Sequence, residues 1–193
     1  LLDTAISYGQ GHNEALVGRA VASSGVPRDN LQIATKFGIV RGDHGVHLDA
    51  HPDRIAGYCD ESLRRLGTET IDLYYLHRVD PQVPIEESIG AMSELVSQGK
   101  VRHLGVSEVT ADQLRRAHAI HPIAAVQFEW SLMWREPEVN IVPAARQLGV
   151  GLVPYSPLGR GLLGGSLNTT SVAESPFRAN DPRFNGSSLT ANM

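Results

Sequence analysis

The feature that most constrains this chain is the regular alternation of short apolar segments with longer segments of helical periodicity. Apolar, β-branched-rich runs of four to eight residues are typical of strands buried on both faces. Six such segments are expected to be strands: Leu1–Asp3, Leu31–Lys36, Ile71–His77, Val101–Ser107, Ile123–Gln127 and Val150–Tyr155.

The segments between these runs carry the start and stop signals of helices. Pro52 and Gly67 bracket one apolar repeat of helical spacing, and Pro84 and Gly99 bracket another. Proline at the start of a helix and glycine just past its end is the usual asymmetry. Three more helices are expected: Asn13–Ser24, a helix behind the capping box that begins at Thr110, and Ile141–Leu148. Repetition of strand and helix predicts a parallel sheet with right-handed crossovers.

Two architectures share this order, a closed (β/α)8 barrel and an open doubly wound sheet. Nearly every strand-like segment ends in a polar side chain, which favours the barrel, because barrels carry their chemistry at the carboxyl ends of the strands. A complete barrel needs about 250 residues, and this chain has 193. We therefore predict an α/β fold of the (β/α)8 TIM-barrel type that is incomplete, with about six of the eight strands.

The barrel portion is expected over residues 1–163. Residues 164–193 are rich in Gly, Ser, Asn, Thr and Pro, and they predict a polar tail, a long loop that is partly disordered. A second loop is expected over Gly38–Pro52. The chain opens on a leucine inside an expected strand, so we expect its true N-terminus to lie upstream.

Composition excludes several classes of function. The net charge is −4 and no run of Lys or Arg exceeds two residues, which argues against nucleic acid and anionic membranes as partners. No apolar run is long enough to span a bilayer. Cys59 is the only cysteine, so an internal disulfide and a cysteine-based zinc site are excluded. Without a recognisable signal peptide, a cytoplasmic location is the default expectation.

Four residues at or near strand ends suggest proton-transfer chemistry: Asp3, Tyr8, Lys36 and His77. A phenol is a weak acid, with an ordinary pKa of about 10, but a neighbouring ammonium stabilises its ionised form, and a carboxylate keeps that ammonium charged. His77 could orient a carbonyl group or help to donate a proton. Each residue taken alone also has a purely structural explanation. Asp3 could cap a turn and Tyr8 could be a loop aromatic. Lys36 could extend its charged end to solvent, and His77 could be a histidine of the core. Their shared position favours the catalytic reading.

Three other signals are weak. Residues 159–164 spell G-x-G-x-x-G, but no second strand with an acidic end follows, so a Rossmann fingerprint is not supported. His44, His47 and His51 have loose metal-ligand spacing in an expected surface loop, and no metal is predicted. Trp130 and Trp134 could line a substrate pocket or pack in the core.

The chain resembles the aldo-keto reductases, in particular the branch that carries the YSPLGRG motif. The matching pieces occur in the family's order: DTAISYGQGHNEALVGRA, ATKFG, SLRRLGTETIDLYYLHRVD, GKVRHLGVSE, VQFEWSL and PYSPLGRGLL. The resemblance implies NADPH-dependent reduction of aldehydes or ketones, with hydride transfer from the nicotinamide to the carbonyl carbon. The family's catalytic tetrad falls on Asp3, Tyr8, Lys36 and His77, with Tyr8 as general acid.

The resemblance also implies cofactor contacts. Ser107 and Gln127 match residues that bind the nicotinamide carboxamide, and Tyr155 matches the aromatic residue that supports the ring. The loop along the pyrophosphate corresponds to Ser156, Leu158, Gly159, Arg160 and Gly161. The implied cofactor is NADPH (NADP), although the segment that would distinguish it from NADH is not in the chain.

The resemblance is truncated at both ends, since the family's first strand would lie upstream of Leu1 and its last strand beyond Met193. A sheet with two open edges invites self-association, which is one expectation for partners besides a small-molecule carbonyl substrate. The alternative to an enzyme is a non-catalytic regulatory or binding subunit, or an inactive fragment.

Overall fold

A computed structural model describes residues 1–42 and 45–192. These residues form two compact units. The first comprises Leu1–Phe128 with Asn140–Val153, and the second comprises Glu129–Val139 with the residues from Pro154 onward. Within the described ranges, no helix has the length and apolar character that crossing a membrane requires.

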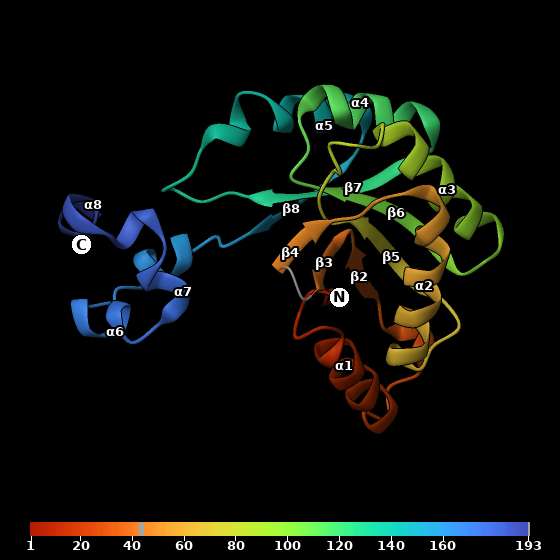
Figure 1. The fold of residues 1–193 in the computed structure, drawn as a ribbon, viewed down its shortest axis with the longest axis horizontal. Coiled ribbons are helices and arrows are strands. Elements are labelled where there is room, and N and C mark those ends of the chain that lie inside the picture. The colour runs from red at the N-terminus through yellow and green to blue at the C-terminus, as the bar shows by residue number, and fades with distance from the viewer. Residues whose placement is uncertain (43–44, 193) are drawn as a thin grey trace. The chain divides into compact units, whose positions relative to one another are not determined.

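The main sheet contains all six predicted strands (Figure 1). Its strand order is β1-β2-β5-β6-β7-β8, and the pairs from β1 to β7 are parallel. The strands are β1 (Leu2–Asp3), β2 (Ile33–Phe37), β5 (Ile71–Leu76), β6 (Val101–Ser107), β7 (Ile123–Glu129) and β8 (Gly151–Tyr155). The order follows the sequence, as it does in a barrel, so the prediction of an incomplete (β/α)8 fold is confirmed.

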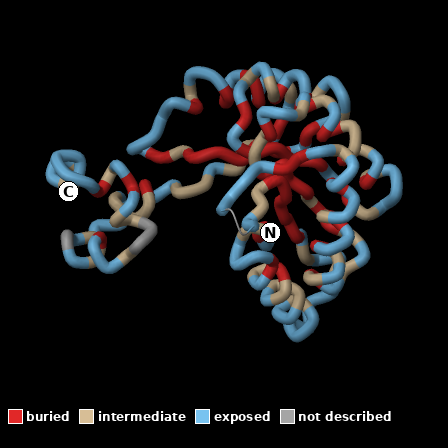
Figure 2. The backbone as a smooth tube through the Cα atoms, in the orientation of Figure 1, coloured by how far each residue is buried: buried red, intermediate tan, exposed pale blue. Residues whose placement is uncertain are grey.

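The five predicted helices are also present: α1 (His12–Ser23), α2 (Pro52–Leu66), α3 (Ile85–Ser97), α4 (Ala111–Ile120) and α5 (Ile141–Leu148). Their ends match the sequence signals. Gly67 ends α2 in the left-handed conformation, with φ 64°, and the capping box between Thr110 and Gln113 begins α4. In the first unit the buried positions follow the strands, while the helices expose their outer faces (Figure 2).

The curl of the sheet brings its first strand within hydrogen-bonding reach of its fifth. The Gln127 Nε2 atom on β7 donates to Asp3 Oδ2 on β1, at 3.0 Å. Inside this curve the fully buried Tyr75 ring packs with Ala34 and Ala125. Gly105 makes room for the ring, since a Cβ atom there would lie 2.5 Å from Tyr75 Cδ1.

The expected loop over Gly38–Pro52 contains regular structure instead. Strands β3 (Ile39–Gly42) and β4 (Gly45–Leu48) form an antiparallel pair in which Val40 faces His47. Both strands are mostly exposed, so they lack the buried apolar run by which strands of the main sheet were recognised.

The expectation of a long loop over residues 164–193 is likewise corrected. The second unit contains the 3-10 turns η2 (Glu136–Glu138), η3 (Gly159–Gly164) and η4 (Pro182–Phe184), and the short helices α6 (Thr169–Ala173), α7 (Pro176–Ala179) and α8 (Gly186–Asn192). Asn168 caps α6 in a capping box, and Phe184 is buried. Helices of four to seven residues are too short to show a periodic apolar face. This unit comprises Glu129–Val139 and the residues from Pro154 onward, whereas the sequence-based boundary lay at residue 164.

Candidate active site

The first unit brings the four predicted catalytic residues to one edge of the sheet. Asp3 ends β1, Lys36 lies near the end of β2, and His77 directly follows β5. Tyr8 lies in the turn between β1 and α1. Because parallel strands present their carboxyl ends at the same edge, neighbouring strands place these groups side by side.

Lys36 is the centre of the cluster. Its side chain is fully buried, and the Nζ atom donates to Asp3 Oδ1 and to the Thr4 carbonyl oxygen, the latter at 2.9 Å. The Tyr8 hydroxyl lies 3.5 Å from Nζ. A buried ammonium is stable only when it is paired and hydrogen-bonded, so these contacts keep the lysine cationic beside the phenol. Tyr8 is 43% exposed and can therefore reach a ligand.

His77 lies against Tyr8 and is held as a neutral imidazole. The two rings meet edge to face, with centroids 6.1 Å apart. Burial, together with the positive charges of Lys36 and Arg78, lowers the pKa of His77 to about 3. Its Nδ1 atom has no hydrogen-bond partner among the described residues. At neutral pH the ring thus has one donor and one acceptor nitrogen, which suits it to orient a carbonyl group.

Ser107 and Gln127 are paired neighbours on β6 and β7. Arg78 Nη1 donates to Ser107 Oγ at 3.2 Å, so the Ser107 hydroxyl can still donate. Gln127 donates from Nε2 to Asp3, which leaves its Oε1 atom as an acceptor. One hydroxyl donor beside one amide acceptor matches a carboxamide group, so these two residues fit the nicotinamide. Arg78 was missed in the sequence, where its position directly after His77 was the only signal.

The other cofactor candidates lie in the second unit, in one tight turn. Tyr155 ends β8, and the backbone then passes through left-handed conformations at Ser156 (φ 50°), Gly159 (φ 56°), Arg160 (φ 58°) and Gly161 (φ 103°). The Gly159 amide donates to the Ser156 carbonyl at 2.9 Å, and the Gly161 amide donates to the Leu158 carbonyl at 3.0 Å. Glycine adopts this conformation at positions 159 and 161 without steric cost, whereas Ser156 and Arg160 adopt it as residues with side chains, which is uncommon.

Ion pairs within the second unit hold this turn. The Arg160 guanidinium pairs with Asp181 and, at 3.4 Å, with Glu129. Arg183 also pairs with Glu129, and its guanidinium lies 5.6 Å from the centre of the Trp134 ring. These arginines border a cleft of about 430 Å³ lined by Trp134, Arg160, Asn180, Asp181, Pro182 and Arg183. Glu129 lies within the motif VQFEWSL, but no role was predicted for it, nor for Asp181 and Arg183.

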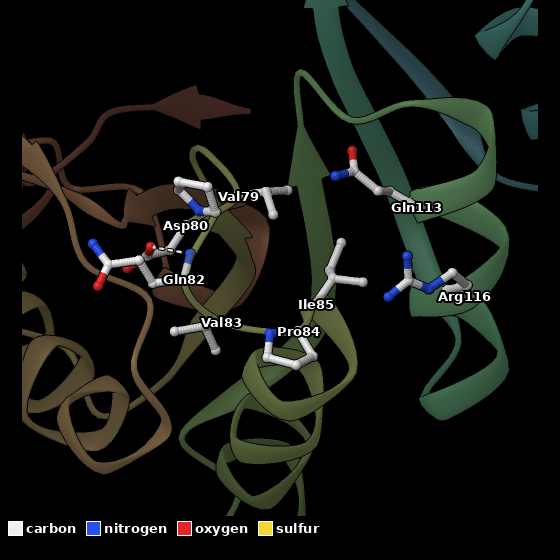
Figure 3. A pocket seen from close by; sticks show the side chains of 9 residues that line it. Val79, Asp80, Gln82, Val83, Pro84, Ile85, Gln113 and Arg116 are labelled. Atoms are coloured by element: carbon white, nitrogen blue, oxygen red, sulfur yellow. Dashed lines mark hydrogen bonds between the residues drawn. The ribbon is translucent and has the colours of Figure 1, made fainter.

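A second cleft, of about 390 Å³, lies in the first unit between the β5–α3 loop and α4 (Figure 3). It is lined by Val79, Asp80, Pro81, Gln82, Val83, Pro84, Ile85, Gln113 and Arg116. Its charged groups are already engaged, since Asp80 accepts from the Gln82 amide and Arg116 pairs with Glu86. None of the four catalytic candidates lines it, so we do not assign the active site there.

The histidines considered as metal ligands do not form a described site. His44 lies outside the described residues. Within residues 1–42 and 45–192, no group of three or more His, Cys, Asp or Glu side chains is arranged to hold a metal ion.

Comparison with known protein families and sequences indicates one family for this chain. Residues 1–192 match the Aldo/keto reductase family. A protein of Glycine max named probable aldo-keto reductase 1 is 50% identical over 191 residues, which make up 98% of this chain and 55% of that protein. The chain therefore spans about half the length of this curated relative.

Solved structures of the same family share the fold. The glycerol dehydrogenase AKR11B4 from Gluconobacter oxydans superposes with a TM-score of 0.88 at 35% identity, over 98% of this chain and 59% of that one. The aldo-keto reductase AKR11C1 from Bacillus halodurans, in its holo form, gives a TM-score of 0.76 at 35% identity, over 84% of this chain and 54% of that one.

Proposed function

The chain belongs to the aldo/keto reductase family, and from this premise we propose that it reduces aldehydes or ketones to alcohols with NADPH. The observation that carries the proposal is the buried Lys36 ammonium, which contacts both the Asp3 carboxylate and the Tyr8 hydroxyl. This arrangement is what proton donation by a phenol requires.

In the proposed reaction Tyr8 is the general acid. Reduction of a carbonyl group develops negative charge on its oxygen, and Tyr8 gives a proton to that oxygen. The Lys36 ammonium stabilises the phenolate that remains, and Asp3 keeps Lys36 charged despite its burial. Proton transfer by a positioned side chain contributes about 10²–10⁴-fold to the rate.

His77 orients the substrate in this proposal. Because its imidazole is neutral at physiological pH, it can donate a hydrogen bond to the carbonyl oxygen without adding a positive charge that would compete with Lys36. Its position against the Tyr8 ring directs both groups toward the same ligand atom.

Bound NADPH would supply the hydride that reduces the carbonyl carbon. Ser107 and Gln127 would hold the carboxamide of the nicotinamide through one donor and one acceptor. For Tyr155 and for the turn formed by Ser156, Leu158, Gly159, Arg160 and Gly161, the resemblance to the family is what supports a role in cofactor binding. The choice of NADPH over NADH is part of the proposal.

The test is NADPH oxidation followed by absorbance in the purified protein. p-Nitrobenzaldehyde is one substrate, and glyceraldehyde is a second, because one structural relative is named a glycerol dehydrogenase. Tyr8→Phe should lower turnover by about 10²–10⁴-fold while the fluorescence of bound NADPH is retained.

Tyr74→Phe is the matched control. The Tyr74 hydroxyl is buried and has no hydrogen-bond partner among the described residues, so its removal should leave turnover unchanged. Equal turnover in Tyr8→Phe and Tyr74→Phe would reject Tyr8 as the acid. NADPH binding without any turnover in the wild-type protein would favour a binding or regulatory role.

A further inference from the structure

Glu14 is a buried charge that the proposed reaction does not use. It lies in the first turn of α1 and is fully buried. Both of its carboxylate oxygens are hydrogen-bonded at 2.6 Å, Oε1 by the Thr35 hydroxyl and Oε2 by Arg65 Nε. Burial of a carboxylate is costly unless every contact is made, so the position of Glu14 is tightly specified.

The partner of Glu14 on the sheet is the residue directly before Lys36. Side chains alternate between the two faces of a strand, so Thr35 faces the helices while Lys36 faces the interior of the curve. A similar contact occurs at the end of β1, where Thr4 directly follows Asp3. The Thr4 hydroxyl donates to Asn13 Oδ1 at 2.7 Å. Asn13 and Glu14, two consecutive residues of α1, therefore bind the residues next in sequence to Asp3 and Lys36, which are Thr4 and Thr35.

The same helical turn also holds the backbone of Tyr8. The backbone amide of Asn13 donates to the backbone carbonyl oxygen of Tyr8 at 3.2 Å. Gly11, just before α1, lets Arg65 pass close over the turn, since a Cβ atom there would lie 2.6 Å from Arg65 Cδ. Arg65 thereby reaches Glu14 across the segment that carries Tyr8.

We propose that Asn13 and Glu14 are positioning residues that set the distance between the Tyr8 hydroxyl and the Lys36 ammonium, 3.5 Å in this structure. Through Thr4 and Thr35 they fix the two strands that carry Asp3 and Lys36, and through the start of α1 they fix the turn that carries Tyr8. The inference rests on the proposed reductase function, because it assigns a role in that reaction.

Thr35→Val is the most informative variant, because it removes the hydroxyl but keeps the shape of the side chain and the Glu14–Arg65 ion pair. A displacement of about 1 Å can cost about 10²-fold in rate, so kcat should fall by about 10- to 100-fold, with the KM for NADPH unchanged.

Two further variants separate positioning from general destabilisation. Thr35→Ser retains the hydroxyl that donates to Glu14 and should therefore restore kcat to within about threefold of the wild type. Ser62→Ala removes a buried hydroxyl that has no partner among the described residues and should change nothing.

The outcomes are distinguishable. If the wild type reduces carbonyls and Thr35→Val keeps the wild-type kcat, the positioning role is overturned and the proposed function stands. An equal loss of kcat in Thr35→Val and Thr35→Ser also overturns it, because the hydroxyl would then be irrelevant. Absence of turnover in the wild type would overturn the proposed function and this inference with it.

Discussion

The two units hold their candidate functional groups in different ways. In the first unit the groups lie on or next to parallel strands, and Lys36 is fixed by burial and by two hydrogen bonds. In the second unit they lie on an irregular turn with left-handed residues, and Arg160 is fixed by ion pairs with Glu129 and Asp181.

This difference suits the two sets of groups to different tasks, the first to proton transfer and the second to ligand binding. Groups on strands keep their geometry to within fractions of an ångström, which proton transfer demands. A turn held by ion pairs can adjust as a ligand enters and leaves. We therefore expect changes at the Asp3, Tyr8, Lys36 and His77 cluster of the first unit to alter kcat, and changes at the turn of the second unit to alter cofactor affinity.

The largest effect should come from Lys36→Met, which removes the charge and keeps the length of the side chain. Without the ammonium, the Tyr8 phenolate loses its nearest stabilising cation, and kcat should fall by about 10²–10⁴-fold. The dissociation constant for NADPH, measured by fluorescence, should change much less. A variant that loses affinity but keeps kcat would break the proposed division between the units.

The second prediction concerns the stability of the first unit and its pH dependence. The pKa of His77 is lowered to about 3 in the folded protein, by burial and by the charges of Lys36 and Arg78, whereas an unfolded histidine has a pKa of about 6.5. Below that pH the unfolded state binds a proton that the folded state does not, so stability is lost as the pH falls. Between pH 7 and 5 this loss amounts to up to about 2 kcal/mol.

His77→Gln should abolish this part of the pH dependence. The measurement is the free energy of unfolding in urea at pH 7 and pH 5, with the exposed His103 replaced by Gln as the control. Identical losses in the wild type and in His77→Gln would show that His77 is not a buried neutral imidazole.

The smallest effect is expected in the second unit. Asp181 is buried and accepts a hydrogen bond from Arg160. Asp181→Asn keeps the shape but removes the charge, so the turn at Arg160 loses one of its ties. NADPH should bind about tenfold more weakly, a change of about 1.4 kcal/mol, with kcat unchanged. Isothermal titration would detect this, and tighter binding would mean that Asp181 competes with the cofactor for Arg160.

How much could be predicted from the sequence depended on buried apolar runs and on end signals. The strands and helices of the main sheet were predictable, because most carry an apolar run or an apolar helical face and have clear end signals, such as Pro52 and Gly67 around α2. The β3–β4 pair was not, because its residues are mostly exposed, and the helices after residue 164 were not, because four to seven residues are too few to show a helical apolar face. In these segments tertiary contacts, such as the burial of Phe184, decide the structure.

In the candidate site, too, some features could be predicted from the sequence and others could not. Asp3, Lys36 and His77 could be placed together because parallel strands end at a common edge. The hydrogen bond from Gln127 to Asp3 spans 124 positions in the chain and depends on the curl of the sheet, which no local pattern encodes. The partners of Arg160 are 21 and 31 positions away, and no local pattern in the sequence indicates that pairing.

The most direct test of the central claim is to follow the hydride itself. The purified protein would be given NADPH deuterated at the transferable C4 position together with p-nitrobenzaldehyde, and the alcohol would be analysed by mass spectrometry, beside Tyr8→Phe and Tyr74→Phe. The account predicts one deuterium on the carbinol carbon in the wild type and in Tyr74→Phe, and almost no labelled alcohol in Tyr8→Phe. Labelled alcohol at the wild-type rate from Tyr8→Phe, or none from the wild type, would contradict it.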